Sequence, residues 1–177
     1  MLAIHQSRSR GNDFREEARV LEADPFTTPN GIVTATQFAD KACPVVFRDS
    51  SMRQILAFEH PEAGIQLVKG TIEPGEDART AALRELEEEA GIVDTAIAKD
   101  LGTWAPTGSG QVWSLQLCTY SPRLPDSWTH HCPDDGGHDL RFFWHDMYRE
   151  PGREWADQFQ RALATIRERT RPLRWRG

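Results

Sequence analysis

The chain is organised around residues 70–92, which read GTIEPGEDARTAALRELEEEAGI. Pro74-Gly75 predicts a turn in the first part of this stretch. Asp77 is a suitable N-cap, and residues 78–90 are good or neutral helix formers, so a helix is predicted directly after it. Gly91 is placed to end that helix, since glycine adopts the left-handed conformation common at helix C-termini.

The predicted helix has two distinct faces. One face is apolar and is expected to meet a core; it consists of Ala82, Leu83, Leu86 and Ala90. Glu85, Glu88 and Glu89 converge on another face, whereas Glu87 points elsewhere. Carboxylates near a helix C-terminus oppose its dipole, and like charges four residues apart cost roughly 0.2–0.5 kcal/mol each. A divalent cation such as Mg²⁺ would compensate for this repulsion, and a solvated acidic face is the alternative interpretation.

The spacing of residues in this stretch resembles the Nudix box. The matching positions are Gly70, Glu76, Arg84-Glu85-Leu86, Glu88-Glu89 and Gly91-Ile92, separated by five, seven, one and one residues. The resemblance implies the Nudix hydrolase fold, an α/β fold in which a mixed β-sheet lies between helices (α/β/α). It also implies Mg²⁺- or Mn²⁺-dependent hydrolysis of a diphosphate (pyrophosphate) linkage, commonly in a nucleoside diphosphate derivative or related nucleotide.

The resemblance also implies a set of metal ligands. Glu88 and Glu89 correspond to the principal ligands, and Glu85 contributes directly or through water. The carbonyl group at Gly70 helps to coordinate the metal ion, and Glu76 supports the site from the loop side.

Two basic residues accompany these carboxylates. Arg84 corresponds to the arginine that pairs with a box glutamate and orients it, a role outside the ligand shell that still affects the metal. The alternative interpretation of Arg84 is an ordinary surface ion pair, which contributes little to the stability of the fold. Lys69 is expected either to contact a substrate phosphate or to remain a solvated lysine. In the implied reaction, bound metal lowers the pKa of a water molecule and a base takes its proton before it attacks phosphorus.

The catalytic base in this family often lies outside the box, so the segment around residues 130–139 supplies the candidates. His138 suits general-base work near neutral pH, and Asp135 and Asp139 are the other candidates, with substrate contacts as a second role. Trp104 is a candidate to stack on a base, and so is Trp113, although such residues are commonly part of a core. Two alternatives for the polar segment stay open: a solvent-facing loop, or a zinc site formed by His130, His131, Cys132 and His138.

Composition limits the class of protein. The chain has 177 residues, of which 38% are hydrophobic and 27% charged, which is typical of one soluble domain. A net charge of −6 argues against a general affinity for nucleic acid or anionic membrane. The resemblance to the Nudix family implies a small nucleotide or other diphosphate as the partner. The sequence has no signal segment, and its three cysteines lack CxxC spacing, so reduced thiols and a cytoplasmic location are expected.

The expected domain organisation is an N-terminal extension, residues 1–30, followed by a Nudix domain over residues 31–177. The extension is interpreted as a loosely held segment, with a lid over the substrate or an arm of a homodimer as the alternative. Strands are expected over residues 31–36, 42–48, 53–59, 65–68, 96–104, 112–120 and 140–145, and a second amphipathic helix over residues 154–169.

Two other functions remain open at this point. A Nudix-fold sensor would bind nucleotide without hydrolysing it, but the intact acidic set argues against that function. An isoprenyl diphosphate isomerase would need a catalytic cysteine, for which Cys43 and Cys118 are the candidates. Assays of diphosphate cleavage and of double-bond migration distinguish these functions.

Overall fold

The computed structural model describes residues 38–119, 124–133 and 137–176. The description below concerns only the unit that spans residues 37–177. The strand expected over residues 31–36 and the boundary at residue 30 lie outside the described residues. The division into an extension and a domain therefore stays a prediction.

The described strands form two four-stranded sheets. In spatial order the first sheet contains β4 (Gly70–Thr71), β1 (Lys41–Val45), β6 (Trp113–Cys118) and β5 (Ile97–Trp104). The second contains β3 (Gly64–Gln66), β2 (Gln54–His60), β8 (His138–Asp146) and β7 (Ser127–Cys132). The first sheet is mixed, because β1 pairs with β6 in parallel and with β4 in antiparallel orientation. The second sheet is antiparallel throughout.

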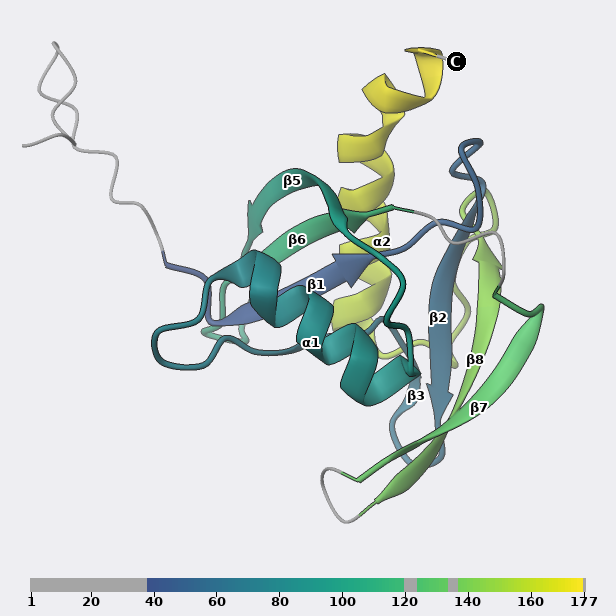
Figure 1. The fold of residues 1–177 in the computed structure, drawn as a ribbon. Coiled ribbons are helices and arrows are strands. Elements are labelled where there is room, and N and C mark those ends of the chain that lie inside the picture. Colours follow the sequence, from purple (N-terminus) through teal and green to yellow (C-terminus); the bar gives the residue numbers. More distant parts are fainter. Residues whose placement is uncertain (1–37, 120–123, 134–136, 177) are drawn as a thin grey trace, which may run out of the picture. The chain divides into compact units, whose positions relative to one another are not determined.

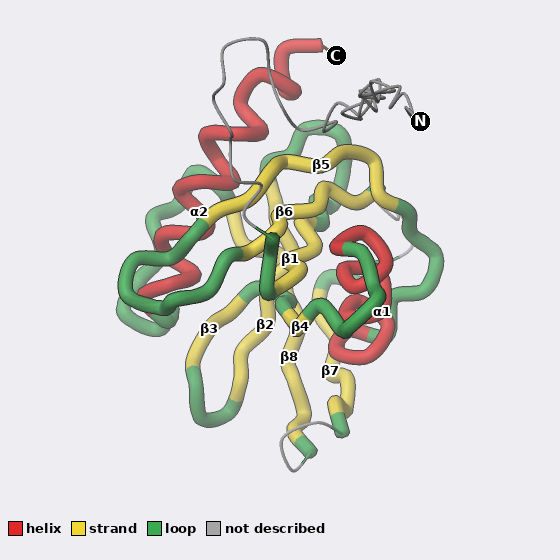
Figure 2. The backbone as a smooth tube through the Cα atoms, turned by 90° about the vertical axis from the view of Figure 1, so that its left-hand side faces the viewer, coloured by secondary structure: helices red, strands yellow, loops and turns green. Residues whose placement is uncertain are grey.

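Two α-helices lie on opposite sides of the first sheet (Figures 1 and 2). They are α1 (Ala78–Ala90) and α2 (Asp157–Thr170), and a short 3-10 helix, η2 (Arg171–Arg176), follows α2. A mixed sheet between helices is the predicted architecture, with the addition that the strands divide into two sheets. No helix of the described ranges is long and apolar enough to cross a bilayer.

The predicted bounds of α1 are confirmed. The Asp77 carboxylate accepts hydrogen bonds from the backbone N–H groups of Arg79 and Thr80 at 2.9 and 2.8 Å, as an N-cap does. Gly91 has a φ of 70°, the left-handed conformation that ends the helix.

One position of the predicted apolar face of α1 is wrong. Leu83 is only half-buried, and Ala81 is buried in its place. The reason is that Ala81 and Ala82 pack against Ala42 of β1. Three small side chains at this contact set which face of the helix meets the sheet.

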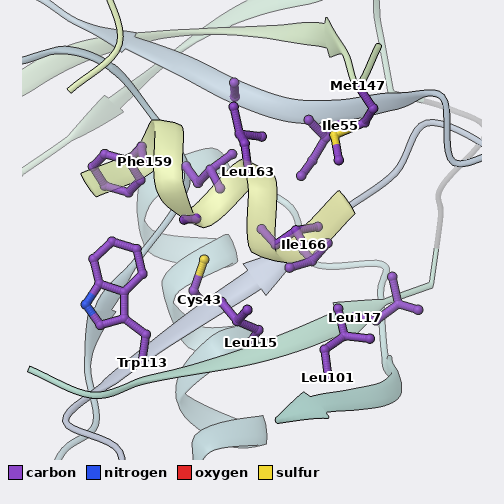
Figure 3. Close-up of a cluster of buried hydrophobic side chains, with 14 of the residues drawn as sticks. Cys43, Ile55, Leu101, Trp113, Leu115, Leu117, Met147, Phe159, Leu163 and Ile166 are labelled. Atoms are coloured by element: carbon purple, nitrogen blue, oxygen red, sulfur yellow. The ribbon is translucent and has the colours of Figure 1, made fainter. Parts of the chain in front are cut away.

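The main core lies between α2 and the first sheet (Figure 3). Side chains of both elements meet there; labelled examples are Phe159, Leu163 and Ile166 from α2, and Cys43, Leu115 and Trp113 from the sheet. The helix begins later than expected, at Asp157. Residues 154–156 instead run beside β3, where the N–H of Ile65 donates to the carbonyl of Glu154 at 2.7 Å.

The interpretation of the polar segment around residue 130 as a solvent-facing loop is wrong. Residues 127–132 form β7, which pairs with β8 along its whole length. Trp128, His130 and Cys132 are buried or half-buried, and the residues between them are exposed. This is the alternation of a half-buried strand, but polar residue types at buried positions concealed it in the sequence.

Candidate active site

Arg84 joins the loop before α1 to the helix itself. Its Nε and Nη2 atoms donate to the two carboxylate oxygens of Glu76, both at 3.0 Å. Its Nη1 atom donates to Glu85 Oε1 and to Glu88 Oε2, both at 2.8 Å, and Nη2 also donates to the carbonyl of Thr71 at 2.8 Å. The hydrogen bonds from Arg84 lower the pKa of the Glu76 carboxyl group. Two glutamates of α1 thus direct one oxygen each at a single cationic nitrogen.

Gly70 allows Glu85 to occupy its buried position. The Glu85 residue is only 6% exposed, and its carboxyl group lies directly against Gly70. A Cβ atom at position 70 would lie 1.7 Å from the Glu85 carboxyl carbon, so no larger residue fits without displacing this carboxylate. Gly70 pairs with Ala42 of β1, which fixes it in the first sheet.

A pocket of about 270 Å³ lies beside this cluster. Its lining comes from α1, β2, β7, β8 and the segment around β3, and consists of Phe58, His60, Ala63, Gln66, Lys69, Glu89, Cys132, His138 and Leu140. The pocket therefore brings together three of the predicted site residues, Lys69, Glu89 and His138. Burial is the main cause that lowers the pKa of Lys69.

His60 is a pocket residue that the sequence analysis missed. Its ring centroid lies 4.6 Å from that of His138. The Nδ1 atom of His60 accepts hydrogen bonds from the backbone N–H groups of Glu62 and Ala63, at 3.1 and 3.2 Å. Since Nδ1 is an acceptor, the neutral ring carries its proton on Nε2. The two histidines are 78 positions apart in different strands, so no local motif indicates their proximity.

Comparison with known proteins identifies the family. Residues 40–163 match the family described as NUDIX domain. The chain belongs to this family. The Nudix resemblance inferred from residues 70–92 is therefore confirmed.

The Nudix domain has sequence and structural relatives. The chain is 46% identical to Nudix hydrolase 25 of Arabidopsis thaliana over 39 residues, and this match spans only 22% of that protein and 22% of this chain. Solved structures with a similar fold include an ADP-ribose pyrophosphatase from Streptococcus suis 89-1591, with a TM-score of 0.52 and 14% identity, covering 74% of this chain and 90% of that chain. A NUDIX-family hydrolase from Clostridium perfringens has a TM-score of 0.51 and 14% identity, covering 71% of this chain and 93% of that one. These likenesses confirm the predicted fold class.

Three other predicted site residues of the Nudix domain do not line the pocket. Trp104 is half-buried and packs edge-on against Trp113, with ring centroids 5.2 Å apart, and Trp113 is fully buried. Trp113 is thus a core residue, and neither tryptophan lines the pocket. Asp139 is exposed and bonds to His131 at 2.9 Å. Asp135 lies outside the described residues.

The carboxylates of the Nudix box fit a hard divalent cation by their chemistry. Glu85 and Glu88 converge on Nη1 of Arg84, and Glu89 faces the pocket from the same end of α1. Oxygen donors of this kind are those that Mg²⁺ prefers. In the arrangement seen, Arg84 provides the positive charge, and no three acidic, histidine or cysteine side chains of the described residues form a ready metal site.

The zinc site considered for the β7–β8 segment is not formed by the described residues. His130 and His131 lie on opposite faces of β7, because neighbouring side chains of a strand alternate. The His130 ring bonds to the carbonyl of Glu88, and the His131 ring bonds to Asp139.

The cysteines of the domain are buried free thiols. Cys43 is 0% exposed and Cys118 is 3% exposed, and burial raises the pKa of each thiol to about 12. A thiol with so high a pKa is a poor nucleophile near neutral pH, because the thiolate is the reactive form. The isomerase alternative therefore gains no support from either residue.

Proposed function

We propose that this protein is a Nudix hydrolase that cleaves a diphosphate linkage, in a nucleoside diphosphate derivative or related nucleotide, by attack of water on phosphorus. The observation that carries the proposal is the position of Glu89, Lys69 and His138 around one pocket, next to the carboxylates that Arg84 holds. Acidic, basic and imidazole groups in one concave site are the groups that this reaction requires.

In the proposed mechanism, each pocket side chain has a task set by its chemistry. Lys69 binds a phosphoryl oxygen, because its side chain lines the pocket and carries an ammonium group. His138 takes the proton of the attacking water. His60, with its proton on Nε2, donates a hydrogen bond to a substrate oxygen and orients the diphosphate relative to His138.

We further propose that the enzyme uses Mg²⁺ or Mn²⁺, held by Glu85, Glu88 and Glu89 with the carbonyl group of Gly70. Bound metal supplies positive charge that stabilises the phosphoryl oxygens during hydrolysis. Arg84 keeps Glu85 and Glu88 directed at one point, and Glu76 fixes the guanidinium group from the loop. The oxygen chemistry of this set supports the assignment.

The test is product release from a panel of nucleoside diphosphate derivatives, dinucleoside polyphosphates and nucleoside triphosphates, with and without Mg²⁺. Wild type, Glu89→Gln and Glu87→Gln are assayed side by side. Glu87 is the matched control, because it is an exposed glutamate of α1 that does not line the pocket. We expect metal-dependent cleavage of one substrate class, lost in Glu89→Gln and retained in Glu87→Gln.

Two results would contradict the proposal. Equal losses in both variants would show that a general loss of negative charge matters, rather than the position of Glu89. Tight nucleotide binding without cleavage of any compound would favour the sensor function instead.

A further inference from the structure

Two side chains of β7 donate hydrogen bonds to the last turn of α1. The indole Nε1–H group of Trp128 donates to the carbonyl of Ala90 at 3.0 Å. The Nε2 atom of His130 lies 3.1 Å from the carbonyl oxygen of Glu88, and since a carbonyl can only accept, this nitrogen carries the proton. Both side chains lie on the same face of β7, because they are two positions apart in the strand.

These carbonyl groups have no partner within the helix. The last four carbonyls of an α-helix lack the N–H groups of a following turn. Here the N–H groups of Gly91 and Ile92 bond to the carbonyls of Glu87 and Leu86, which leaves the carbonyls of Glu88 and Ala90 to β7. The donors from β7 thus hold the helix turn that carries Glu88 and Glu89.

The contact between His130 and the helix end is close. A Cβ atom at Gly91 would lie 2.9 Å from Nδ1 and 3.0 Å from Cε1 of His130. The Trp128 ring also stacks on Phe142 of β8, with ring centroids 5.0 Å apart and an angle of 13° between the rings. Neither donor can swing away without losing this packing.

The same hairpin carries pocket residues. Cys132 pairs directly with His138 in the β7–β8 register, and both residues line the pocket. Trp128 and His130 lie on β7 four and two residues before Cys132. One hairpin therefore contacts the carboxylate end of α1 and also carries the imidazole proposed to act on water.

We propose that Trp128 and His130 are positioning residues that fix Glu88 and Glu89 relative to His138 through the last-turn carbonyls of α1. This inference rests on the proposed function. It assigns to β7 a role that the Nudix box itself does not include: the hairpin fixes the acidic end of the helix relative to His138.

The test compares variants that remove a donor with matched variants elsewhere on the hairpin. His130→Leu removes the donor to Glu88, and His130→Gln retains an N–H group. Trp128→Phe retains a ring on Phe142 but removes the donor to Ala90. The controls are His131→Leu, which loses a bond to Asp139, and Trp144→Phe, which loses the 2.9 Å bond to the carbonyl of Pro125.

Two readouts that need no turnover are measured on the full chain. Mn²⁺ affinity is followed by electron paramagnetic resonance without substrate, and hydrogen exchange is followed in the peptide that covers residues 86–92. We expect His130→Leu and Trp128→Phe to weaken Mn²⁺ binding roughly tenfold, the usual scale for outer-shell partners. Exchange in the peptide should accelerate about threefold to tenfold, as expected for loss of one hydrogen bond.

His130→Gln and both controls should stay within about twofold of wild type in both readouts. Wild-type exchange in His130→Leu and Trp128→Phe would overturn the positioning role. So would a folded His130→Gln protein that resembles His130→Leu. Faster exchange with unchanged Mn²⁺ affinity would show that these contacts only stabilise the helix end, and would overturn the positioning role as well. If wild type itself binds no Mn²⁺, the metal assignment in the proposed function fails, and unchanged hydrogen exchange in residues 86–92 would still overturn the role of β7.

Discussion

Replacement of Gly70 by alanine should damage the carboxylate cluster more than its small size suggests. The new Cβ atom would lie 1.7 Å from the Glu85 carboxyl carbon, well inside contact distance. Backbone strain is not the cause, since Gly70 is not among the glycines with positive φ. The Glu85 side chain must move, and it is buried, so it must move within a packed site.

The expected cost follows from what Glu85 loses. Displacement breaks its 2.8 Å hydrogen bond to Arg84, and a bond to a charged group contributes about 1.5–3 kcal/mol. Overpacking a tight site adds about 1–3 kcal/mol, part of which relaxes as the carboxylate shifts. We therefore expect Gly70→Ala to lower the free energy of unfolding by about 2–4 kcal/mol, or the melting temperature by roughly 4–16 °C for a chain of this size.

The chain offers a matched control at Gly152. A Cβ atom there would lie 2.1 Å from Oε2 of Glu154, a clash with the same kind of group. Glu154 is exposed, so its carboxylate can turn into solvent and Gly152→Ala should cost less than about 0.5 kcal/mol. Urea unfolding of both variants measures the difference.

A double-mutant cycle then isolates the clash. In a Glu85→Ala background the obstructing carboxylate is absent, so Gly70→Ala should cost little, and the coupling energy should equal most of its cost in wild type. Equal unfolding midpoints for Gly70→Ala and Gly152→Ala would refute this reasoning. An undiminished cost of Gly70→Ala without Glu85 would refute it as well.

Three further predictions follow from the same structure. Arg84→Lys replaces a planar fork by one ammonium group, so Mn²⁺ affinity in a binding titration should fall roughly tenfold. Because Arg84 holds the pKa of Glu76 below its usual 4.5, the folded state favours the ionised carboxylate. The resulting stability is present above pH 4.5 and is lost as pH falls through the lowered pKa, so the urea midpoint of unfolding should fall over this pH range. Arg84→Met should make the urea midpoint depend less on pH over the same range. Cys43 and Cys118 are buried and do not line the pocket, so Ellman's reagent should modify these two thiols rapidly only after unfolding. Rapid labelling of either thiol in the native protein would contradict this.

The sequence predicts those parts of the fold that depend on neighbouring residues. The bounds of α1 follow from Asp77 and Gly91, which act within one helical turn. The sequence does not predict β7, because histidine is a polar residue type and a hydropathy scale therefore places residue 130 in a loop. In the structure His130 is half-buried within the strand. His130 contacts the carbonyl of Glu88 and the backbone at Gly91. These contacts depend on how the β7–β8 hairpin packs on α1, which the local sequence does not specify.

Of the candidate site too, the sequence predicts the residues whose placement is local and not those whose placement depends on strand pairing. The carboxylates of α1 and Arg84 are readable from spacing, because helical geometry alone places them on adjoining faces. His60 is not readable, since its position beside His138 depends on the pairing of β2 with β8. Trp104 and Trp113 are candidates for base stacking by residue type, but the pairing of β5 with β6 brings the two rings together and Trp113 is fully buried.

The parallel pairing of β1 with β6 has a consequence for folding. Lys41 pairs with Trp113, so the chain between them, which includes α1 and the whole Nudix box, forms one closed loop. Closing a loop of about 70 residues costs chain entropy before its contacts form. The box helix can form from local signals, yet its docking site at Ala42 is completed only when this distant pairing is made. The acidic site should therefore refold more slowly than the helix forms, because its refolding is limited by the rate at which β6 pairs with β1.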